Sequence, residues 1–238
     1  MTTPPVTGTA PPWAATVSVE WLDQMAAAAT FLSHALLRRD AATTMVHELE
    51  SSGLAGGWPL PGAAHRTGAV LLEAAVAEHA PAEVLADDYN ALFLGPGHMH
   101  ACPYESVYRS LEGLTFEAET MQVRKFYADH DLQAPAFNRE PDDHVGLEVA
   151  FIGQLCLAAL NAMEDNEPAR ATDFVSSARL FVGQHLGVWG PDFCTRVIDN
   201  AQTAFYTAVG HLLLGLIGEF PRQAGDALPL RCDSSANG

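Results

Sequence analysis

Three carboxylates, an imidazole and a proline occur within five consecutive residues in the second half of the chain. They are Glu140, Pro141, Asp142, Asp143 and His144. Carboxylates can pair with arginine side chains or bind metal ions, and an imidazole can transfer protons or bind metal ions. This segment, the acidic motif, is therefore the strongest candidate for a functional site in the sequence.

The acidic motif is predicted to lie at the start of a helix. Proline is favoured in the first helical turn, and acidic side chains there face the positive end of the helix dipole. Asp142 is the predicted cap of a helix that runs to about Met163. His144, Glu148 and Phe151 recur at helical spacing, so we expect them to share one face of that helix.

The composition indicates a folded protein with a strongly acidic surface. Of the 238 residues, 48% are hydrophobic, which is enough for a sizeable core. The 29 acidic and 12 basic residues give a formal net charge of -17. Nucleic acid binding needs a basic surface, so this balance argues against nucleic acid and favours a basic partner.

The chain shows no predicted export signal or membrane anchor. Residues 1–17 lack a basic segment and an apolar run, so we expect a disordered tail there and a flexible tail at 223–238. The apolar stretch 204–220 has about the minimum length of a membrane span and contains His211 and Glu219, which favours a buried helix. The four cysteines lack C-x-x-C spacing, as expected for reduced thiols in a cytoplasmic protein.

Helical periodicity recurs along the chain, and the alternation typical of strands is almost absent. Ser18 and Asp40 are the predicted caps of the first two helices, the second of which ends near Gly53. Further helices are expected at about 65–79, 81–94, 115–127, 142–163, 168–186 and 191–220, the last with a break near residue 200. The pattern predicts an all-α fold with one domain over residues 18–222, in which the loop 95–105 acts as a hinge.

Three motifs occur in a specific order. They are Asp88-Tyr89-x-x-Leu92-Phe93-x-Gly95-Pro96-Gly97, then Pro103-Tyr104-Glu105-Ser106-Val107-Tyr108, then Glu140-Pro141-Asp142-Asp143-His144-x-x-x-Glu148-x-x-Phe151. Together they resemble the TorD/DmsD/NarJ-type redox-enzyme maturation chaperones. The resemblance covers about residues 20–220 and extends to His185-Leu186-x-x-Trp189 and Phe205-Tyr206.

The resemblance implies a cytoplasmic, all-helical TorD-like chaperone that is not an enzyme and holds no cofactor. Such proteins bind the twin-arginine signal peptide and the apo form of a molybdopterin-dependent oxidoreductase subunit. They assist cofactor insertion and delay export until folding is complete. The resemblance also implies a monomer or a domain-swapped dimer, while the charge and the apolar pattern argue against nucleic acid and against stable insertion into a membrane.

The residue chemistry fits a receptor for such a leader, which carries a basic pair followed by an apolar segment. Arginine pairs bidentately with carboxylates, so the receptor needs acidic side chains beside an apolar groove. The candidate carboxylates are Glu105, Glu140, Asp142 and Asp143. The groove candidates are Tyr89, Leu92, Phe93, Tyr104 and Phe151, and the resemblance adds His144 and Glu148 to the client-binding set.

Structural roles remain open for several of these residues. Leu92 and Phe93 have a spacing that more often marks core packing than a binding surface. Asp142 can cap a helix as well as contact a peptide. His144 and Glu148 can form a buried pair, since buried polar groups normally have partners.

A metal-dependent helical hydrolase or oxidase is the competing interpretation. Its candidate ligands are Asp142, Asp143, His144 and Glu148. However, the sequence has no Glu-x-x-His motif of the kind found in helical di-iron proteins. The segment His98-x-His100-x-Cys102 also carries metal-binding side chains, but no second cluster at zinc spacing accompanies it. The sequence therefore favours the chaperone.

Overall fold

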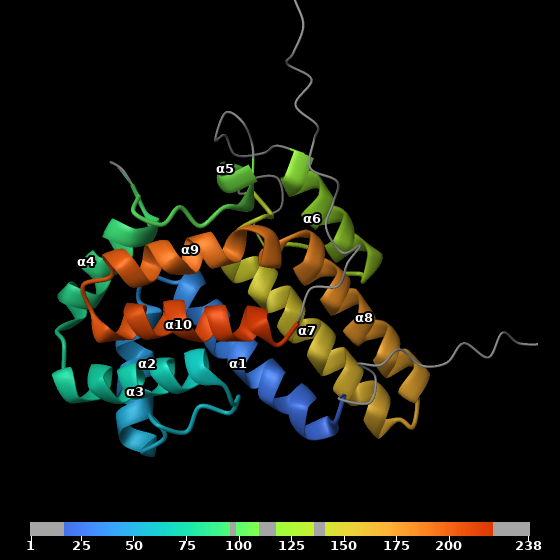
Figure 1. The fold of residues 1–238 in the computed structure, drawn as a ribbon, viewed down its shortest axis with the longest axis horizontal. Coiled ribbons are helices and arrows are strands. Elements are labelled where there is room, and N and C mark those ends of the chain that lie inside the picture. Colours follow the sequence, from blue (N-terminus) through green and yellow to red (C-terminus); the bar gives the residue numbers. More distant parts are fainter. Residues whose placement is uncertain (1–16, 96–98, 110–117, 136–140, 221–238) are drawn as a thin grey trace, which may run out of the picture.

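The computed structural model describes residues 17–95, 99–109, 118–135 and 141–220 (Figure 1). The helices in these ranges are α1 (Val19–Leu37), α2 (Ala41–Ser52), α3 (Ala63–Glu78), α4 (Ala82–Phe93), α5 (Glu105–Arg109), α6 (Ala118–Asp129), α7 (Val145–Glu164), α8 (Pro168–Gln184), α9 (Leu186–Asn200) and α10 (Ala204–Gly218). The described residues contain no β-strand, so the prediction of an all-α fold is confirmed. Apart from Val17, the predicted tails lie outside the described residues.

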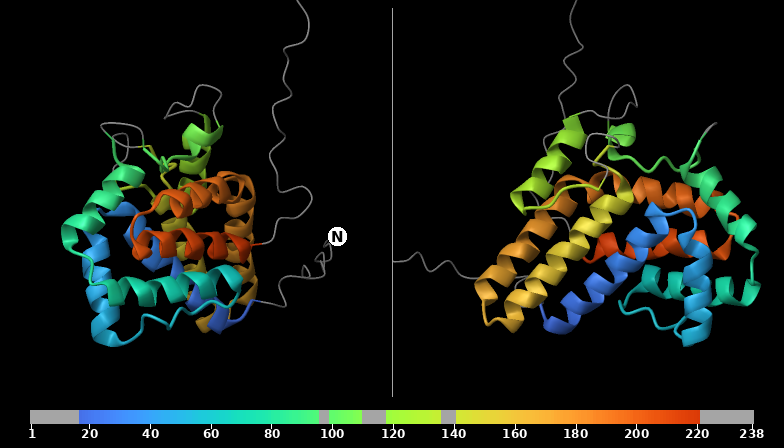
Figure 2. Two further views of the ribbon diagram at one scale, coloured as in Figure 1. Left: turned by 60° about the vertical axis from the view of Figure 1, so that its left-hand side comes forward. Right: turned by 180° about the vertical axis from the view of Figure 1, so that it is seen from behind.

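Two pairs of helices form the centre of the molecule. α1 packs along α7, and α10 packs along α3. α8 covers α7, α9 covers α10, and a contact between α1 and α10 connects the two pairs. Figure 1 shows α10 between α9 and α3, and the view from behind in Figure 2 shows α1 and α7 side by side. The apolar faces of these helices bury one continuous core.

Small residues allow these helices to approach closely. A Cβ atom on Gly153 of α7 would lie 3.0 Å from the Cβ atom of Ala29 of α1. A Cβ atom on Gly68 of α3 would overlap the side chain of Leu212 of α10. Since larger side chains would not fit, these positions set the spacing of both central pairs.

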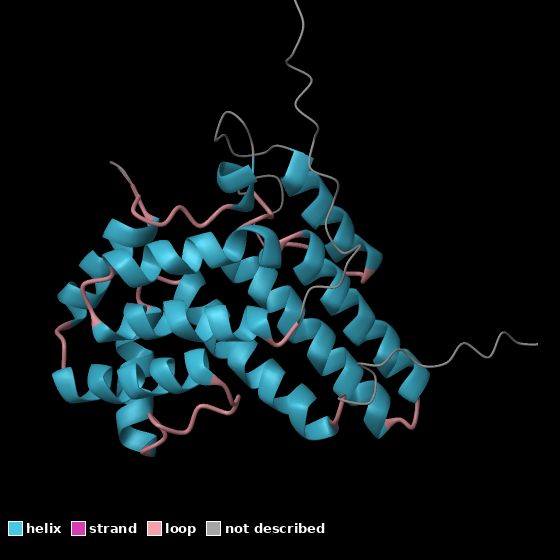
Figure 3. Ribbon diagram, in the orientation of Figure 1, coloured by secondary structure: helices cyan, strands magenta, loops and turns pink. Residues whose placement is uncertain are grey.

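Most predicted helix positions are confirmed (Figure 3). Ser18 caps α1, because its hydroxyl oxygen accepts a hydrogen bond from the backbone N–H of Trp21 at 3.1 Å. α2 ends before Gly53, whose φ of 67° suits glycine. Asp40 precedes α2 as predicted, but its side chain makes no cap hydrogen bond and instead pairs with Arg38.

The structure corrects the predicted start of α9. This helix begins at Leu186, so Pro191 lies inside it and does not open it. Leu186, Trp189 and Phe193 are buried on the same helix. Their burial starts the helix on the N-terminal side of the proline, despite the N–H group that the proline lacks. The predicted break near Asn200 is confirmed, since residues 201–203 separate α9 from α10.

Two further differences concern the segment before the acidic motif. The short helix α5 was not predicted. The start of the helix predicted at 115–127 lies outside the described residues, and the described part of that helix, α6, extends from Ala118 to Asp129.

Burial explains the two most apolar helices. α7 is long and apolar enough to cross a membrane by length and composition alone, but 61% of that stretch is buried inside the protein. The C-terminal apolar stretch forms α10, which has 15 residues and a buried apolar face. Both helices have the composition of core helices.

The two ends of the helical unit meet at one place. Trp21, near the start of α1, packs edge-to-face on Phe220 with 5.8 Å between ring centroids. Its indole N–H donates to Oε2 of Glu219 at 3.3 Å. Nε2 of His65 in α3 lies 3.6 Å from Oε1 of the same carboxylate. This contact connects the beginning of α1, the end of α10 and the start of α3.

Candidate functional site

The second and third sequence motifs lie side by side. Tyr104 and His144 form an antiparallel backbone bridge, and their rings pack edge-to-face with 5.2 Å between centroids. The backbone N–H of Glu105 donates to the backbone oxygen of Asp143 at 3.0 Å. The structure therefore brings residues 103–109 and the described part of the acidic motif into one cluster. Glu140 lies outside the described residues.

His144, rather than Asp142, caps α7. The helix predicted to start at Asp142 begins at Val145, because residues 142–143 form a turn and the backbone bridge with Tyr104 keeps His144 extended. Nδ1 of His144 accepts a hydrogen bond from the N–H of Gly146 at 3.0 Å. Removal of water from the imidazole lowers the pKa of His144 to about 4, which keeps this acceptor unprotonated at neutral pH.

Asp143 is bonded to the protein through both carboxylate oxygens. Oδ2 accepts a hydrogen bond from the N–H of Ser106 at 2.8 Å, and Oδ1 accepts one from the hydroxyl of Thr120 at 2.7 Å. The side chain is fully buried. Asp143 thus joins the starts of α5, α6 and α7, and this arrangement is structural.

Glu105 is likewise bonded through both oxygens. Oε1 pairs with the guanidinium of Arg109, one turn later in α5. Oε2 lies 2.8 Å from Nδ1 of His185, between α8 and α9. Arg109 also donates to the backbone oxygen of Gln184 at 2.9 Å. These contacts fix α5 against the junction of α8 and α9.

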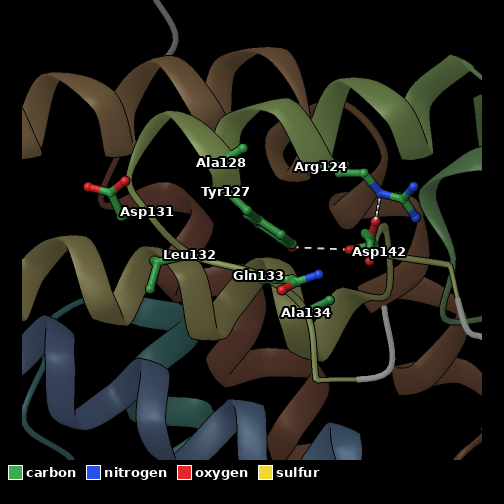
Figure 4. A pocket seen from close by; sticks show the side chains of 8 residues that line it. All are labelled: Arg124, Tyr127, Ala128, Asp131, Leu132, Gln133, Ala134 and Asp142. Carbon is green, nitrogen blue, oxygen red and sulfur yellow. Dashed lines mark hydrogen bonds and ion pairs between the residues drawn. The ribbon is translucent and has the colours of Figure 1, made fainter. Parts of the chain in front are cut away.

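Asp142 differs from its neighbours because only one of its carboxylate oxygens has a partner. Oδ2 pairs with Arg124 of α6, while the backbone oxygen of Asp142 accepts a hydrogen bond from the hydroxyl of Tyr127 at 3.1 Å. Oδ1 is buried and has no hydrogen bond partner. Asp142 also lines a pocket of about 330 Å³ beside α6 (Figure 4).

Glu148 carries its carboxyl group into the protein core. Oε2 accepts a hydrogen bond from the indole N–H of Trp189 at 3.3 Å, and Oε1 has no partner. Burial, followed by the nearby charges of Glu105 and Asp143, raises the pKa of Glu148 well above its usual range. His144 and Glu148 therefore have different partners and do not form the buried pair considered from their spacing.

The apolar candidates lie in the core. Leu92 and Phe93 are buried, and the hydroxyl of buried Tyr89 donates to the backbone oxygen of Leu36 at 3.0 Å. Phe151 is buried against Tyr127 with 4.9 Å between ring centroids. Tyr104, which is half-buried, is the exception among these candidates.

Sequence reasoning missed several partners of the cluster. They are Arg109, Thr120 and Arg124. Arg109 follows Glu105 at i, i+4 spacing, a signal that could have identified the pair. Thr120 and Arg124 give no such signal, since α6 reaches the acidic motif only through the fold.

Asp88, the first residue of the first motif, also has a structural role that the sequence did not reveal. Its carboxylate accepts hydrogen bonds from the N–H of Gln202 at 3.0 Å and from the N–H of Thr203 at 2.8 Å. It also accepts one from the hydroxyl of Thr203 at 2.6 Å. These bonds hold the turn between α9 and α10.

Metal binding has no support within the described part of the chain. No group of three or more His, Cys, Asp or Glu side chains there is arranged to hold a metal ion. The described cysteines, Cys102, Cys156 and Cys194, are free thiols. His98, part of the second metal-binding hypothesis, lies outside the described residues.

Comparison with known proteins assigns this chain to a family. The family model described as nitrate reductase delta subunit matches residues 60–195. Over 137 residues the chain is 29% identical to the chaperone protein TorD of Aliivibrio fischeri, covering 58% of this chain and 62% of that protein. Over 133 residues it is 30% identical to TorD of Vibrio cholerae, covering 56% and 59%.

A third relative is the selenate reductase assembly chaperone protein of Thauera selenatis, which is 31% identical over 150 residues, covering 60% of this chain and 76% of that protein. The chain spans about three fifths of the length of the TorD relatives. These three relatives are named as chaperones. The resemblance to the TorD/DmsD/NarJ type is thereby confirmed, and the chain belongs to the nitrate reductase delta subunit family.

Proposed function

We propose that this protein is a cytoplasmic chaperone for a molybdopterin-dependent oxidoreductase subunit. It binds the twin-arginine signal peptide and the apo form of that subunit, assists insertion of the cofactor and delays export until the subunit has folded. The main support for this proposal is the match of residues 60–195 to the family model. It is joined by relatives named TorD chaperone and selenate reductase assembly chaperone.

Charge supports a basic client. The chain has a formal net charge of -17, which attracts a basic leader over distance and raises the rate of encounter. In the described cluster, Asp142 has a carboxylate oxygen without a partner and lines a pocket. The acidic motif therefore offers a contact for an arginine side chain.

Affinity must come mainly from apolar contact. Exposed ion pairs contribute about 0.2–1 kcal/mol each, whereas micromolar binding needs about 8 kcal/mol. Leu92, Phe93 and Phe151 are buried and cannot supply that contact without rearrangement. Leu132, which lines the same pocket as Asp142, is exposed and provides apolar area next to the acidic motif, and Met121 on α6 is exposed as well.

Calorimetry with leader peptides tests the proposal. A peptide with the basic pair and apolar segment of a molybdopterin oxidoreductase leader should bind the purified protein. A twin-lysine version should bind more weakly, because an ammonium group cannot reproduce the bidentate arginine fork.

A leader peptide with the same composition in scrambled order is the matched control. If neither the leader nor the apo-subunit binds, the proposed function is wrong. Binding of the apo-subunit alone would retain the chaperone role and remove leader recognition.

A further inference from the structure

The buried carboxylates of the cluster are not equally available to a ligand. Both oxygens of Glu105 and both oxygens of Asp143 are bonded within the protein. Asp142, which is 1% exposed, has one oxygen paired with Arg124 and one without a partner. A buried oxygen without a donor is unfavourable, so a ligand that supplies an N–H group would gain free energy there.

Asp142 faces a pocket with enough volume for a side chain. The pocket measures about 330 Å³, and the described residues around it come from α6 and its C-terminal continuation. Figure 4 shows Gln133 and the hydroxyl end of Tyr127 on the same side of the pocket as Asp142, whereas Asp131 lies at the opposite end. The site therefore combines a carboxylate, an amide and an aromatic ring.

The charge of the pocket favours a single cation. Among its described lining residues, Asp131 and Asp142 carry negative charges and Arg124 carries a positive charge. These add to one net negative charge. A carboxylate has acceptor sites on both oxygens, so Asp142 can pair with Arg124 through Oδ2 and with a second guanidinium through Oδ1.

The geometry points to a subsite for one guanidinium group, held by Oδ1 of Asp142 in the pocket between α6 and residues 131–134. The identity of the ligand as a client leader rests on the proposed function, whereas the subsite itself does not. Since Asp142 is the described carboxylate of the cluster that both lines the pocket and has an oxygen without a partner, one arginine of the leader binds here. The two arginines of the pair are therefore not equivalent.

A small probe tests the subsite without a leader. Ethylguanidinium should shift the NMR signals of the backbone amides of Tyr127 and Ala134 in a saturable manner. Asp142→Asn, which removes the charge and keeps the shape, should weaken this binding about tenfold or more, the effect of one charge-assisted hydrogen bond. Asp129→Asn is the matched control, because exposed Asp129 pairs with Lys125 on α6 outside the pocket.

Leader peptides test the inequality of the two arginines. Peptides with Arg-Arg, Gln-Arg or Arg-Gln at the basic pair are titrated into the wild type and Asp142→Asn in a double-mutant cycle. We expect Asp142 to couple to one arginine and not to the other. Gln133→Arg gives a second variant that leaves Asp142 and Arg124 intact, and its own guanidinium should occupy the pocket and weaken both probes.

The outcomes are distinct for the subsite and for the proposed function. Ethylguanidinium binding that depends on Asp142, together with no binding of the leader or of the apo-subunit, supports the subsite and contradicts the proposed function. Leader binding of equal strength to the wild type, Asp142→Asn and Gln133→Arg overturns the subsite and retains the proposed function. Failure of ethylguanidinium to bind the wild type also overturns the subsite.

Discussion

At the scale of single residues, hydrogen bonding inside the protein determines which buried carboxylates keep an oxygen without a partner. Asp143 and Glu105 hold helices together through both oxygens, although their residue types and spacing are those expected of arginine-binding groups. Composition and spacing pointed to residues that the structure brings into one cluster, but they cannot distinguish an acid that lines a pocket from one that accepts a hydrogen bond from a hydroxyl group of the same chain. That distinction depends on Thr120 and Arg124, which the fold brings from α6.

Glu148 gives the sharpest test of burial at this scale. Its raised pKa means that the folded state retains a proton that the unfolded state loses above about its ordinary pKa of 4.5. Stability must therefore fall as pH rises from 4.5 towards the folded-state pKa. We expect Glu148→Gln to be more stable than the wild type at pH 8, with a difference that shrinks as pH falls to 4.5. Urea denaturation between pH 4.5 and pH 8 measures this difference in unfolding free energy.

Glu164→Gln, at the exposed end of the same helix, is the control. Its difference from the wild type in unfolding free energy should stay the same across this pH range. A less stable Glu148→Gln at pH 8 would mean that the folded protein uses the charged carboxylate, against the raised pKa.

At the scale of elements, periodicity predicted helices well, whereas proline predicted their starts only in part: Pro81 precedes α4 and Pro168 opens α8 as expected. The helices expected at 65–79, 81–94 and 168–186 agree with α3, α4 and α8, because each has a clear apolar face between local stop signals. Pro141 and Pro191 failed as start signals for different reasons. After Pro141 the chain makes a turn at 142–143, and His144 is held extended by its bridge to Tyr104, so α7 starts later. Burial of Leu186 and Trp189 instead starts α9 ahead of Pro191.

The cap of α7 leads to a prediction about the element as a whole. His144→Ala should cost about 0.5–2 kcal/mol of unfolding free energy through loss of the acceptor for Gly146, and His144→Asn should retain most of it. The lowered pKa of His144 means that wild-type stability is lost as pH falls from 6.5 towards 4. His144→Asn should lack this loss. Denaturation at pH 7 and pH 5 separates the three proteins.

Exposed His47 on α2 provides the comparison, since His47→Asn should leave the pH dependence unchanged. An identical acid response in the wild type and His144→Asn would show that another group titrates.

At the scale of the whole molecule, the sequence predicted one all-α unit, but not how its distant segments pair. The bridge between Tyr104 and His144 joins residues that no local pattern connects. The hinge predicted for the loop 95–105 depends on the same region, of which residues 96–98 lie outside the described part. The domain-swapped dimer, which would need such a hinge, stays a prediction.

Amide hydrogen exchange tests the hinge. The N–H groups of Ala101 and Glu105 donate to the backbone oxygens of Leu92 and Asp143, at 2.9 and 3.0 Å. We therefore expect slow exchange at both amides in the free protein, which would restrict any hinge to residues before His100. Rapid exchange at both positions would show that these hydrogen bonds open readily and would favour a hinge across the whole loop.

The meeting of Trp21 with Glu219 and Phe220 bears on how the chain can be rearranged. The start of α1 and the end of α10 lie at one place, so a short linker could join them there. New termini could then be opened in the loop between α2 and α3. Such a circularly permuted protein would retain the packing of α1 on α7 and of α10 on α3. The linear order of the helices is then separable from their arrangement in the folded protein.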